Sequence, residues 1–241
     1  MSKEAMIPFG LALESYYKGD KNGKIIYHRD DGGKTEDLIK GYFRNYSEFS
    51  DREKIALKHC QGRILDIGAG AGPHALELQK KGFDVTAIDI SEKACEIMRN
   101  RGVEKVRCVN AYEISERDFD TILILGCSIG FVEDLKGLKM FLEHSKGLLS
   151  NNGMIIMDSR DVRMTNNPHH IKYQQNNIKN GKYRGEIRIQ IEFQGRKGKM
   201  FQILHVDPEA LKKVATALDF NCEILSNSEE GLYLAKLSYL S

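Results

Sequence analysis

Hydrophobic and polar positions along residues 62–160 follow two periods in turn, and the alternation predicts strands and helices. Short apolar runs bounded by polar residues predict strands, and apolar residues three and four positions apart predict amphipathic helices. Strands that alternate with helices at this spacing favour a parallel sheet covered on both faces. The predicted strands are 63–67, 84–89, 106–109, 119–125 and 154–157, and the predicted helices are 73–81, 91–101 and 135–149.

The residues at the helix ends agree with this periodicity. Pro73 takes the first position of a helix, where its missing N–H has no intrahelical partner to lose. Gly82 follows the same helix as a stop signal, and Ser91 is a typical N-cap for the next. The sequence Asn151-Asn152-Gly153 predicts a turn after the third helix.

Two stretches interrupt the alternation. Residues 1–60 predict helices around 8–17 and 36–46, on either side of a turn at 30–33. Residues 160–205 predict a polar, Asn-rich loop and then a β-hairpin of two alternating segments.

The alternation returns after Asp207-Pro208, with a helix and two closing strands, 222–225 and 231–239. The chain therefore divides into an N-terminal cap (1–60), an α/β core (61–159), an inserted loop and β-hairpin (160–205) and a return to the core (206–241).

A run of three glycines is the strongest functional signal. Gly68, Gly70 and Gly72 stand at alternate positions between an acid-bearing strand and the helix that Pro73 opens. A turn without side chains lets a ligand lie directly against backbone N–H groups. Asp89 ends the next strand about 20 residues on, the spacing of an acid that accepts hydrogen bonds from ribose hydroxyls. These features predict a site for a ligand that carries a nucleoside.

Pro73 bears on the identity of that ligand. In the dinucleotide fingerprint a third glycine, which allows close helix–strand packing, would stand at this position. Pro73 therefore disfavours an NAD-dependent oxidoreductase, which remains one alternative. No Gly-Lys-Ser/Thr sequence follows the turn, so a nucleotide-binding P-loop is excluded.

The sequences Leu65–Gly72 and Ile88–Ser91 resemble the nucleotide-binding motifs of class I S-adenosylmethionine-dependent methyltransferases. The resemblance covers roughly residues 60–160 and the closing helix and strands. It implies a doubly wound, mostly parallel α/β sheet of seven strands, with S-adenosyl-L-methionine as cofactor and S-adenosyl-L-homocysteine as product. The residues that it assigns to cofactor binding are Asp66, Gly68, Ala69, Gly70, Asp89, Ile90, Asn110, Ala111, Leu125 and Gly126. Apart from the resemblance, Tyr42 is predicted either to join them from an N-terminal lid or to pack in the core of the cap.

The resemblance gives several of these residues a role. Asp66 would lie beneath the turn near the methionine amino group, and Asp89 would accept both ribose hydroxyls. Asn110 stands where many members have an acid that accepts from the adenine amino group, and its side-chain oxygen can do the same. The Pro-Pro-Tyr motif of methyltransferases that act on nucleic-acid or amide amino groups is absent, which disfavours that subclass.

Methyl transfer is a direct displacement that depends mostly on alignment, so no conspicuous catalytic constellation is required. Acceptor groups are expected at the carboxyl ends of the fourth and fifth strands and in the insertion above them. A neutral histidine there could act as general base, or the two adjacent histidines could be an exposed pair. The predicted catalytic residues are Asp158, His169 and His170, and the predicted substrate-binding residues are Ser128, Arg160, Tyr173 and Arg188.

The charge of the insertion favours an anionic acceptor. The 241 residues carry a net charge of +2, but residues 160–200 hold ten Lys/Arg and three acids, a net charge of +7. Arg160 or Arg188 could bind a carboxylate or phosphate, or the charge could belong to a solvated hairpin face. Few aromatic residues accompany these cations, so nucleic acid is a disfavoured partner.

Composition narrows the class further. The hydrophobic content of 41% and charged content of 29% are ordinary for a soluble globular protein. Five cysteines without a CxxC pair favour a reducing cytoplasm, and neither a membrane span nor a metal site is predicted. With the resemblance, the sequence predicts a methyltransferase that acts on a small molecule, which is anionic if the basic insertion contacts it, and leaves the oligomeric state open. The alternatives are an RNA or protein methyltransferase and a non-catalytic protein that binds the cofactor or its product.

Overall fold

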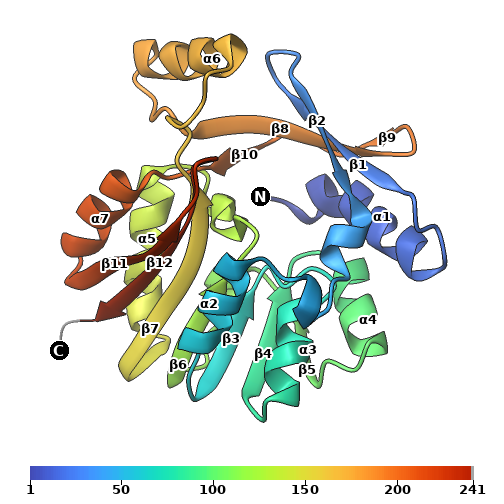
Figure 1. The fold of residues 1–241 in the computed structure, drawn as a ribbon, viewed down its shortest axis with the longest axis vertical. Coiled ribbons are helices and arrows are strands. Elements are labelled where there is room, and N and C mark those ends of the chain that lie inside the picture. Colours follow the sequence, from blue (N-terminus) through green and yellow to red (C-terminus); the bar gives the residue numbers. More distant parts are fainter. Residues whose placement is uncertain (240–241) are drawn as a thin grey trace.

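The computed structural model describes residues 1–239 and contains a seven-stranded sheet with helices on both faces (Figure 1). The strand order is β11-β12-β7-β6-β3-β4-β5. Only β12 runs antiparallel to its neighbours in this sheet. The predicted doubly wound, mostly parallel fold is therefore confirmed. The strands are β3 (Arg63–Ile67), β4 (Asp84–Asp89), β5 (Lys105–Cys108), β6 (Phe119–Ile124), β7 (Leu149–Arg160), β11 (Phe220–Asn227) and β12 (Leu232–Tyr239).

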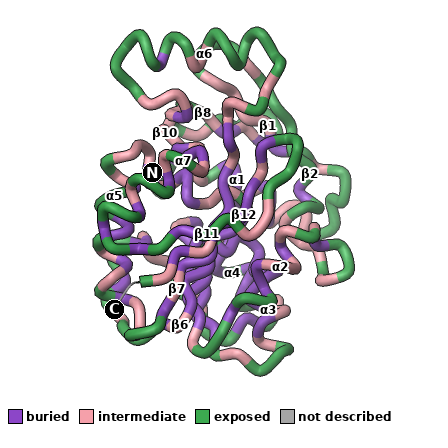
Figure 2. Tube along the Cα trace, turned by 60° about the vertical axis from the view of Figure 1, so that its left-hand side comes forward, coloured by how far each residue is buried: buried purple, intermediate pink, exposed green. Residues whose placement is uncertain are grey.

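Successive side chains of each core strand pack on two different sets of helices. Leu65 and Ile67 of β3 belong to a cluster with α5 and α7, whereas Ile64 belongs to one with α2, α3 and α4. Burial on both faces explains why the strands read as continuous apolar runs, and Figure 2 shows the buried residues concentrated along them. The helices are α2 (Asp51–His59), α3 (Pro73–Lys80), α4 (Glu92–Asn100), α5 (Leu135–Lys146) and α7 (Pro208–Thr216).

A second sheet lies over the carboxyl ends of the core strands (Figure 1). Its centre is the antiparallel pairing of β1 with β8, so a strand that precedes the core and a strand inserted between β7 and β11 of the core form one sheet. The predicted hairpin of residues 186–206 is present in β8 and β10, but its pairing with the N-terminal segment was not predicted. The strands are β1 (Lys24–Arg29), β2 (Lys34–Leu38), β8 (Glu186–Phe193), β9 (Arg196–Lys197) and β10 (Phe201–Leu204).

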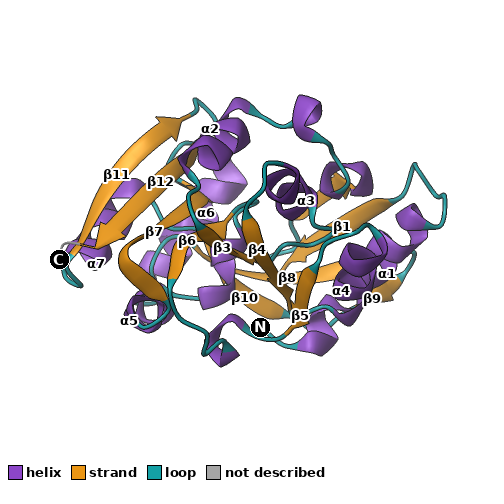
Figure 3. Cartoon of the chain, turned by 90° about the horizontal axis from the view of Figure 1, so that it is seen from below, coloured by secondary structure: helices purple, strands orange, loops and turns teal. Residues whose placement is uncertain are grey.

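The helix α1 (Ile7–Tyr17) joins the two sheets, and it is present where the sequence predicts a helix at 8–17. Its buried residues Phe9 and Leu13 cluster with Ile25 and Ile191 of the second sheet and with Ala71 of the glycine turn. Figure 3 shows α1 beside α4 at the edge of the core. This apolar contact fixes the second sheet relative to the core.

The helix predicted at 36–46 is wrong. Residues 34–38 form β2, which pairs with β1 across the turn at 30–33, and a short 3-10 helix (Ile39–Tyr42) follows. Hydrogen bonds to the neighbouring strand decide the conformation here, because local propensity yields to tertiary pairing.

Two further predictions are wrong. The Asn-rich stretch contains a helix, α6 (Pro168–Lys179), because Asn167 accepts a hydrogen bond from the backbone of His169 and caps its N-terminus. The predicted turn Asn151–Gly153 lies inside β7, where the pairing with β6 shifts register. The helices α5 and α6 have 12 residues each, and no helix within residues 1–239 could cross a membrane.

Truncation of Ile25 tests whether the second sheet contributes to the stability of the whole chain. Its side chain is fully buried against α1, so Ile25→Ala should lower the free energy of unfolding by about 2–5 kcal/mol in urea titrations. Thr35→Ala, on the exposed strand β2, is the control and should change it by less than about 0.5 kcal/mol. Equal small effects would show that the second sheet unfolds separately from the core.

Candidate active site

A cavity of about 750 Å³ lies between the carboxyl ends of the core strands and the second sheet. Its volume is in the range of small-molecule sites, about 300–1,000 Å³. The residues predicted for cofactor binding come from five segments of the chain, and the fold brings all of them to this cavity. They are Tyr42, Asp66, Gly68, Ala69, Gly70, Asp89, Ile90, Asn110, Ala111, Leu125 and Gly126, and Ser128 lines it too.

The glycine turn uses its backbone N–H groups internally. The N–H groups of Gly68 and Ala69 donate to the carbonyl of Ile88, at 2.9 and 3.1 Å, and that of Gly72 donates to Ala69. Gly70 donates to the Asp89 carboxylate at 3.0 Å. The expectation that a ligand would bind these N–H groups is therefore wrong. The glycines instead supply positive φ angles and space, because a ligand can approach where no Cβ stands.

Asp89 is buried at the end of β4 and ties the turn to the next helix. One of its oxygens accepts from Gly70, and the other accepts from the Ser91 N–H at 2.8 Å. Burial raises the pKa of Asp89 to about 6, although both backbone hydrogen bonds act in the opposite direction. Its ionised form is thus costly in the protein alone and gains from any further hydrogen-bond donor in the cavity.

Asp66 is 1% exposed, and its Oδ2 has no hydrogen-bond partner among residues 1–239. Burial raises the pKa of Asp66 to about 6; the charge of His74 opposes the shift and that of Asp89 adds to it. An unpartnered buried carboxylate oxygen is rare in folded proteins. Since Asp66 lines the cavity, a ligand that carries hydrogen-bond donors or a positive charge fits it.

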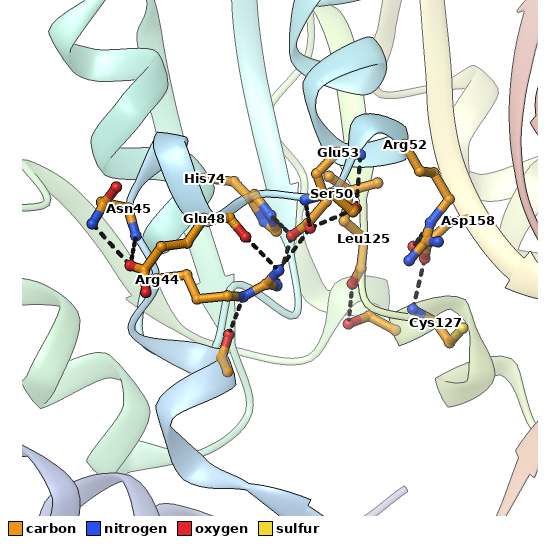
Figure 4. Close-up of polar contacts among 12 residues, drawn as sticks. Arg44, Asn45, Glu48, Ser50, Arg52, Glu53, His74, Leu125, Cys127 and Asp158 are labelled. Atoms are coloured by element: carbon orange, nitrogen blue, oxygen red, sulfur yellow. Dashed lines mark hydrogen bonds and ion pairs between the residues drawn. The ribbon is translucent and has the colours of Figure 1, made fainter. Parts of the chain in front are cut away.

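A buried network holds the N-terminal segment over the glycine turn (Figure 4). Glu53 of α2 accepts two hydrogen bonds from Arg44, at 2.8 and 2.9 Å, and lies 2.8 Å from His74 Nε2 on α3. Burial acts to raise the pKa of Glu53, but the hydrogen bonds from His74 and Arg44 outweigh it and lower that pKa. The three side chains line the cavity, and they fix its side wall while the Glu53 carboxylate stays ionised.

The sequence reasoning missed both α2 and Glu53. The signal was present, because Ser50 and Glu53 form a capping box with the three-residue spacing typical of a helix start.

Asp158 lies beneath the cavity wall rather than in it. Its side chain is fully buried, accepts from the Cys127 N–H at 2.6 Å and pairs with Arg52 at 3.1 Å (Figure 4). Cys127, which lines the cavity, has the left-handed φ of 56° that β-carbon residues rarely adopt. Asp158 therefore positions this strained turn, and its placement gives no support to the predicted catalytic role. Burial raises the pKa of the Cys127 thiol, which stays protonated.

The predicted residues of the insertion do not reach the cavity. His169 and His170 lie on α6, which Figures 1 and 2 show as a largely exposed helix beyond the second sheet. They were expected in a loop above the cavity, and the helix removes that reason for a catalytic role. The Tyr173 hydroxyl instead donates a hydrogen bond to Asp30 Oδ1 at 2.8 Å, which links α6 to the turn between β1 and β2 of the second sheet.

The expected anionic subsite also loses its basis. Arg160 donates to the Glu230 carbonyl at 2.9 Å, and Arg188 lies on β8 with its N–H bonded to the Tyr173 hydroxyl. None of the ten Lys/Arg of residues 160–200 lines the cavity. The charge of the insertion therefore belongs mainly to its outer surface.

Comparison with known proteins identifies the family. A family model described as a methyltransferase domain matches residues 64–153. The structure of a SAM-dependent methyltransferase from Bacteroides fragilis in complex with S-adenosyl-L-homocysteine is 31% identical, with a TM-score of 0.85, and the match covers 98% of this chain and 97% of that one. The chain belongs to the class I S-adenosylmethionine-dependent methyltransferases.

Curated relatives match this methyltransferase over shorter stretches. A glycine/sarcosine N-methyltransferase of Aphanothece halophytica is 29% identical, over 53% of this chain and 51% of its own length. A ubiquinone biosynthesis O-methyltransferase of Rickettsia felis is 27% identical, over 58% of this chain and 54% of its own length. The chain spans about half the length of these relatives.

The site of this methyltransferase fits the family's cofactor. S-adenosylmethionine carries ribose hydroxyls, an ammonium group and a sulfonium, and the buried acids Asp66 and Asp89 can accept from or pair with such groups. Gly70 leaves the space that a Cβ would take beside Tyr42 and Phe9. The chemical match between the site and S-adenosylmethionine rests on Asp66 and Asp89, which are buried and have no cationic partner within the described residues.

A side chain at Gly70 should block the cofactor. Gly70→Val is expected to abolish binding of S-adenosyl-L-homocysteine in calorimetry, because Gly70 lines the cavity. Gly82→Val is the matched control, since Gly82 also has a positive φ (+87°) but has open space around it. Both variants should lose about 1–2 kcal/mol of stability from backbone strain, and only the control should bind. Retained binding by Gly70→Val would contradict the close-approach argument.

Binding of S-adenosyl-L-homocysteine should weaken as pH falls below about 6. The pKa values of Asp66 and Asp89 are each raised to about 6, so both acids gain protons there and lose their full capacity to accept or pair. The ligand favours the ionised acids, so affinity should rise with pH through this window, as calorimetry between about pH 5 and 7 can measure.

In the unliganded protein the same two acids act in the opposite direction on stability. The folded state retains protons that the unfolded chain releases above about pH 4, so their contribution to stability is lost as pH rises through 6.

The variant Asp89→Asn should bind S-adenosyl-L-homocysteine more weakly than the wild type and with a shallower pH dependence. A wild-type affinity that does not change over this window would contradict the assignment of these acids to the ligand.

Proposed function

We propose that this methyltransferase transfers the methyl group of S-adenosyl-L-methionine to a small molecule. The main support is the single cavity that contains both the predicted cofactor residues and side chains of the second sheet. When bound, the cofactor supplies a methyl group on a positively charged sulfur, which is a leaving group by itself. The protein therefore has to bind the cofactor and the acceptor, align the acceptor with the methyl group, and exclude water from the site.

The residues of the chain divide these tasks. Asp66 and Asp89 bind and orient the cofactor, and Gly126 and Cys127 form the wall after β6 that Asp158 supports. The second sheet covers the carboxyl ends of the core strands. Alignment of two bound reactants in one site can contribute up to ~7–11 kcal/mol to the rate. No general base is required for this reading.

The second sheet also favours a small acceptor over RNA or protein, because it covers the side from which a macromolecule would approach. The names of the matched relatives refer to small molecules: glycine and sarcosine in one, and ubiquinone biosynthesis in the other. The walls of the cavity away from the glycine turn are mostly apolar, which suits a partly apolar acceptor. They include Leu38, Phe131, Met140, Ile191, Phe201 and Ile203.

A labelling experiment tests the proposal. The protein is incubated with methyl-labelled S-adenosyl-L-methionine and a cell extract separated into small-molecule, RNA and protein fractions. We expect label in the small-molecule fraction with the wild type and none with Gly70→Val.

Label confined to RNA or protein would contradict the small-molecule acceptor. Cofactor binding without label in any fraction would favour the non-catalytic alternative.

A further inference from the structure

A carboxylate from the second sheet lines the cavity. Asp37 is on β2, opposite Ile25 of β1, and it lines the cavity together with Tyr27 and Tyr42. The two tyrosine hydroxyls are 2.9 Å apart. Burial raises the pKa of both tyrosines, and the charge of Asp37 contributes to each shift. The carboxylate and the two hydroxyls therefore occupy the same part of the cavity.

Asp37 and Asp66 are the two carboxylates of the cavity whose side chains make no hydrogen bond or ion pair within residues 1–239. The Asp37 side chain is solvent-exposed at the edge of the cavity and takes part in no hydrogen bond or ion pair among residues 1–239; its partial burial raises its pKa, and the charge of Arg160 opposes the shift. The other acids each have a place in the structure. Glu53 pairs with Arg44 and His74, Glu133 contacts the Met1 amino group, Asp89 holds Gly70 and Ser91, and Asp66 lies at the glycine turn.

The charge of the cavity as a whole also favours a positively charged ligand. Within the described residues 1–239, five carboxylates line it, but Arg44 is its only lysine or arginine, and Arg44 is already paired with Glu53. A cleft lined by charges of one sign attracts ligands of the opposite sign. Asp66 and Asp89 face the cofactor turn, which leaves Asp37 for the second ligand.

An ammonium group is the chemical match for this corner. It donates charge-assisted hydrogen bonds to a carboxylate, and tyrosine oxygens can accept its remaining protons. A neutral alcohol would leave the carboxylate charge unpaired, and a carboxylate ligand would be repelled. The apolar side chains of Leu38, Ile191 and Phe201 nearby in the cavity lining suit the carbon skeleton of the same molecule.

We propose that Asp37, with Tyr27 and Tyr42, binds the ammonium group of an amine-bearing acceptor and so determines the substrate class. This assignment rests on the proposed function and replaces the anionic acceptor that the basic insertion suggested. Asp37 acts as a specificity-determining residue, and cofactor binding does not depend on it.

The test measures acceptor binding apart from turnover. Matched sets of alkyl and arylalkyl amines, alcohols and carboxylates on the same carbon skeletons are titrated by calorimetry into the protein saturated with S-adenosyl-L-homocysteine. Amines should bind, and alcohols and carboxylates of the same skeleton should bind at least about tenfold more weakly. Asp37→Asn should weaken amine binding by about tenfold to a hundredfold, the loss of a charge-assisted hydrogen bond.

Glu36→Gln is the matched control. Glu36 is the neighbouring acid of β2, pairs with Lys24 at 2.9 Å and does not line the cavity, so amine binding should be unchanged. Both variants should bind S-adenosyl-L-homocysteine as the wild type does, which also shows that they are folded.

Three results would overturn the ammonium subsite: alcohols or carboxylates that bind as well as the amines, amine binding that Asp37→Asn leaves unchanged, or no amine binding at all to the saturated protein. Failure of the wild type to bind S-adenosyl-L-homocysteine would contradict the proposed function instead, so the two failures are distinguishable.

Discussion

The hydrogen bond from the Gly70 N–H to the Asp89 carboxylate is the contact on which the site depends. It joins the turn after β3 to the end of β4, and Ile88 adds two further hydrogen bonds to the same turn. Because the N–H groups of Gly68, Ala69, Gly70 and Gly72 already have hydrogen-bond partners within the protein, the shape of the turn is fixed before any ligand binds. Preorganisation of this kind lowers the entropy lost on binding. The surface offered to the cofactor is therefore a rigid, side-chain-free edge flanked by two desolvated acids.

The acids of the cavity show how stability and function divide among similar groups. Glu53 is buried and fully paired, and its network stabilises the contact of the N-terminal segment with α3. Asp66 is buried and incompletely paired, which lowers the stability of the protein alone and leaves capacity for a ligand. Asp158 has a supporting role, since its partners Arg52 and Cys127 join α2 to the turn after β6. Carboxylate side chains thus perform three physical tasks within one site.

The sequence predicts the core well and the second sheet poorly, for a physical reason. The turn at Gly68–Gly72 and the acid at Asp89 are local signals, because strand, turn and helix are adjacent in the chain. The pairing of Tyr27 with Ile191 in the second sheet joins the N-terminal segment to the insertion after β7, more than 160 residues on, and no local pattern encodes it.

The wrong assignments on the acceptor side follow from the same limit. Without α6, the residues His169 and Tyr173 looked like a loop above the cavity. Asp37 could not be recognised as a site residue, because the sequence predicts a helix over its segment. Its neighbours Tyr27 and Tyr42 come close to it only when β1 and β2 pair.

The division of the second sheet between two distant segments has a consequence for synthesis of the chain. The strands β1 and β2 leave the ribosome first, yet their partner β8 follows only after β7 of the core. An isolated two-stranded hairpin is marginally stable in water. The glycine turn and its acids can therefore form during translation before the second sheet covers the cavity. Closure of the cavity by the second sheet is therefore a late, non-local event in the synthesis of the chain.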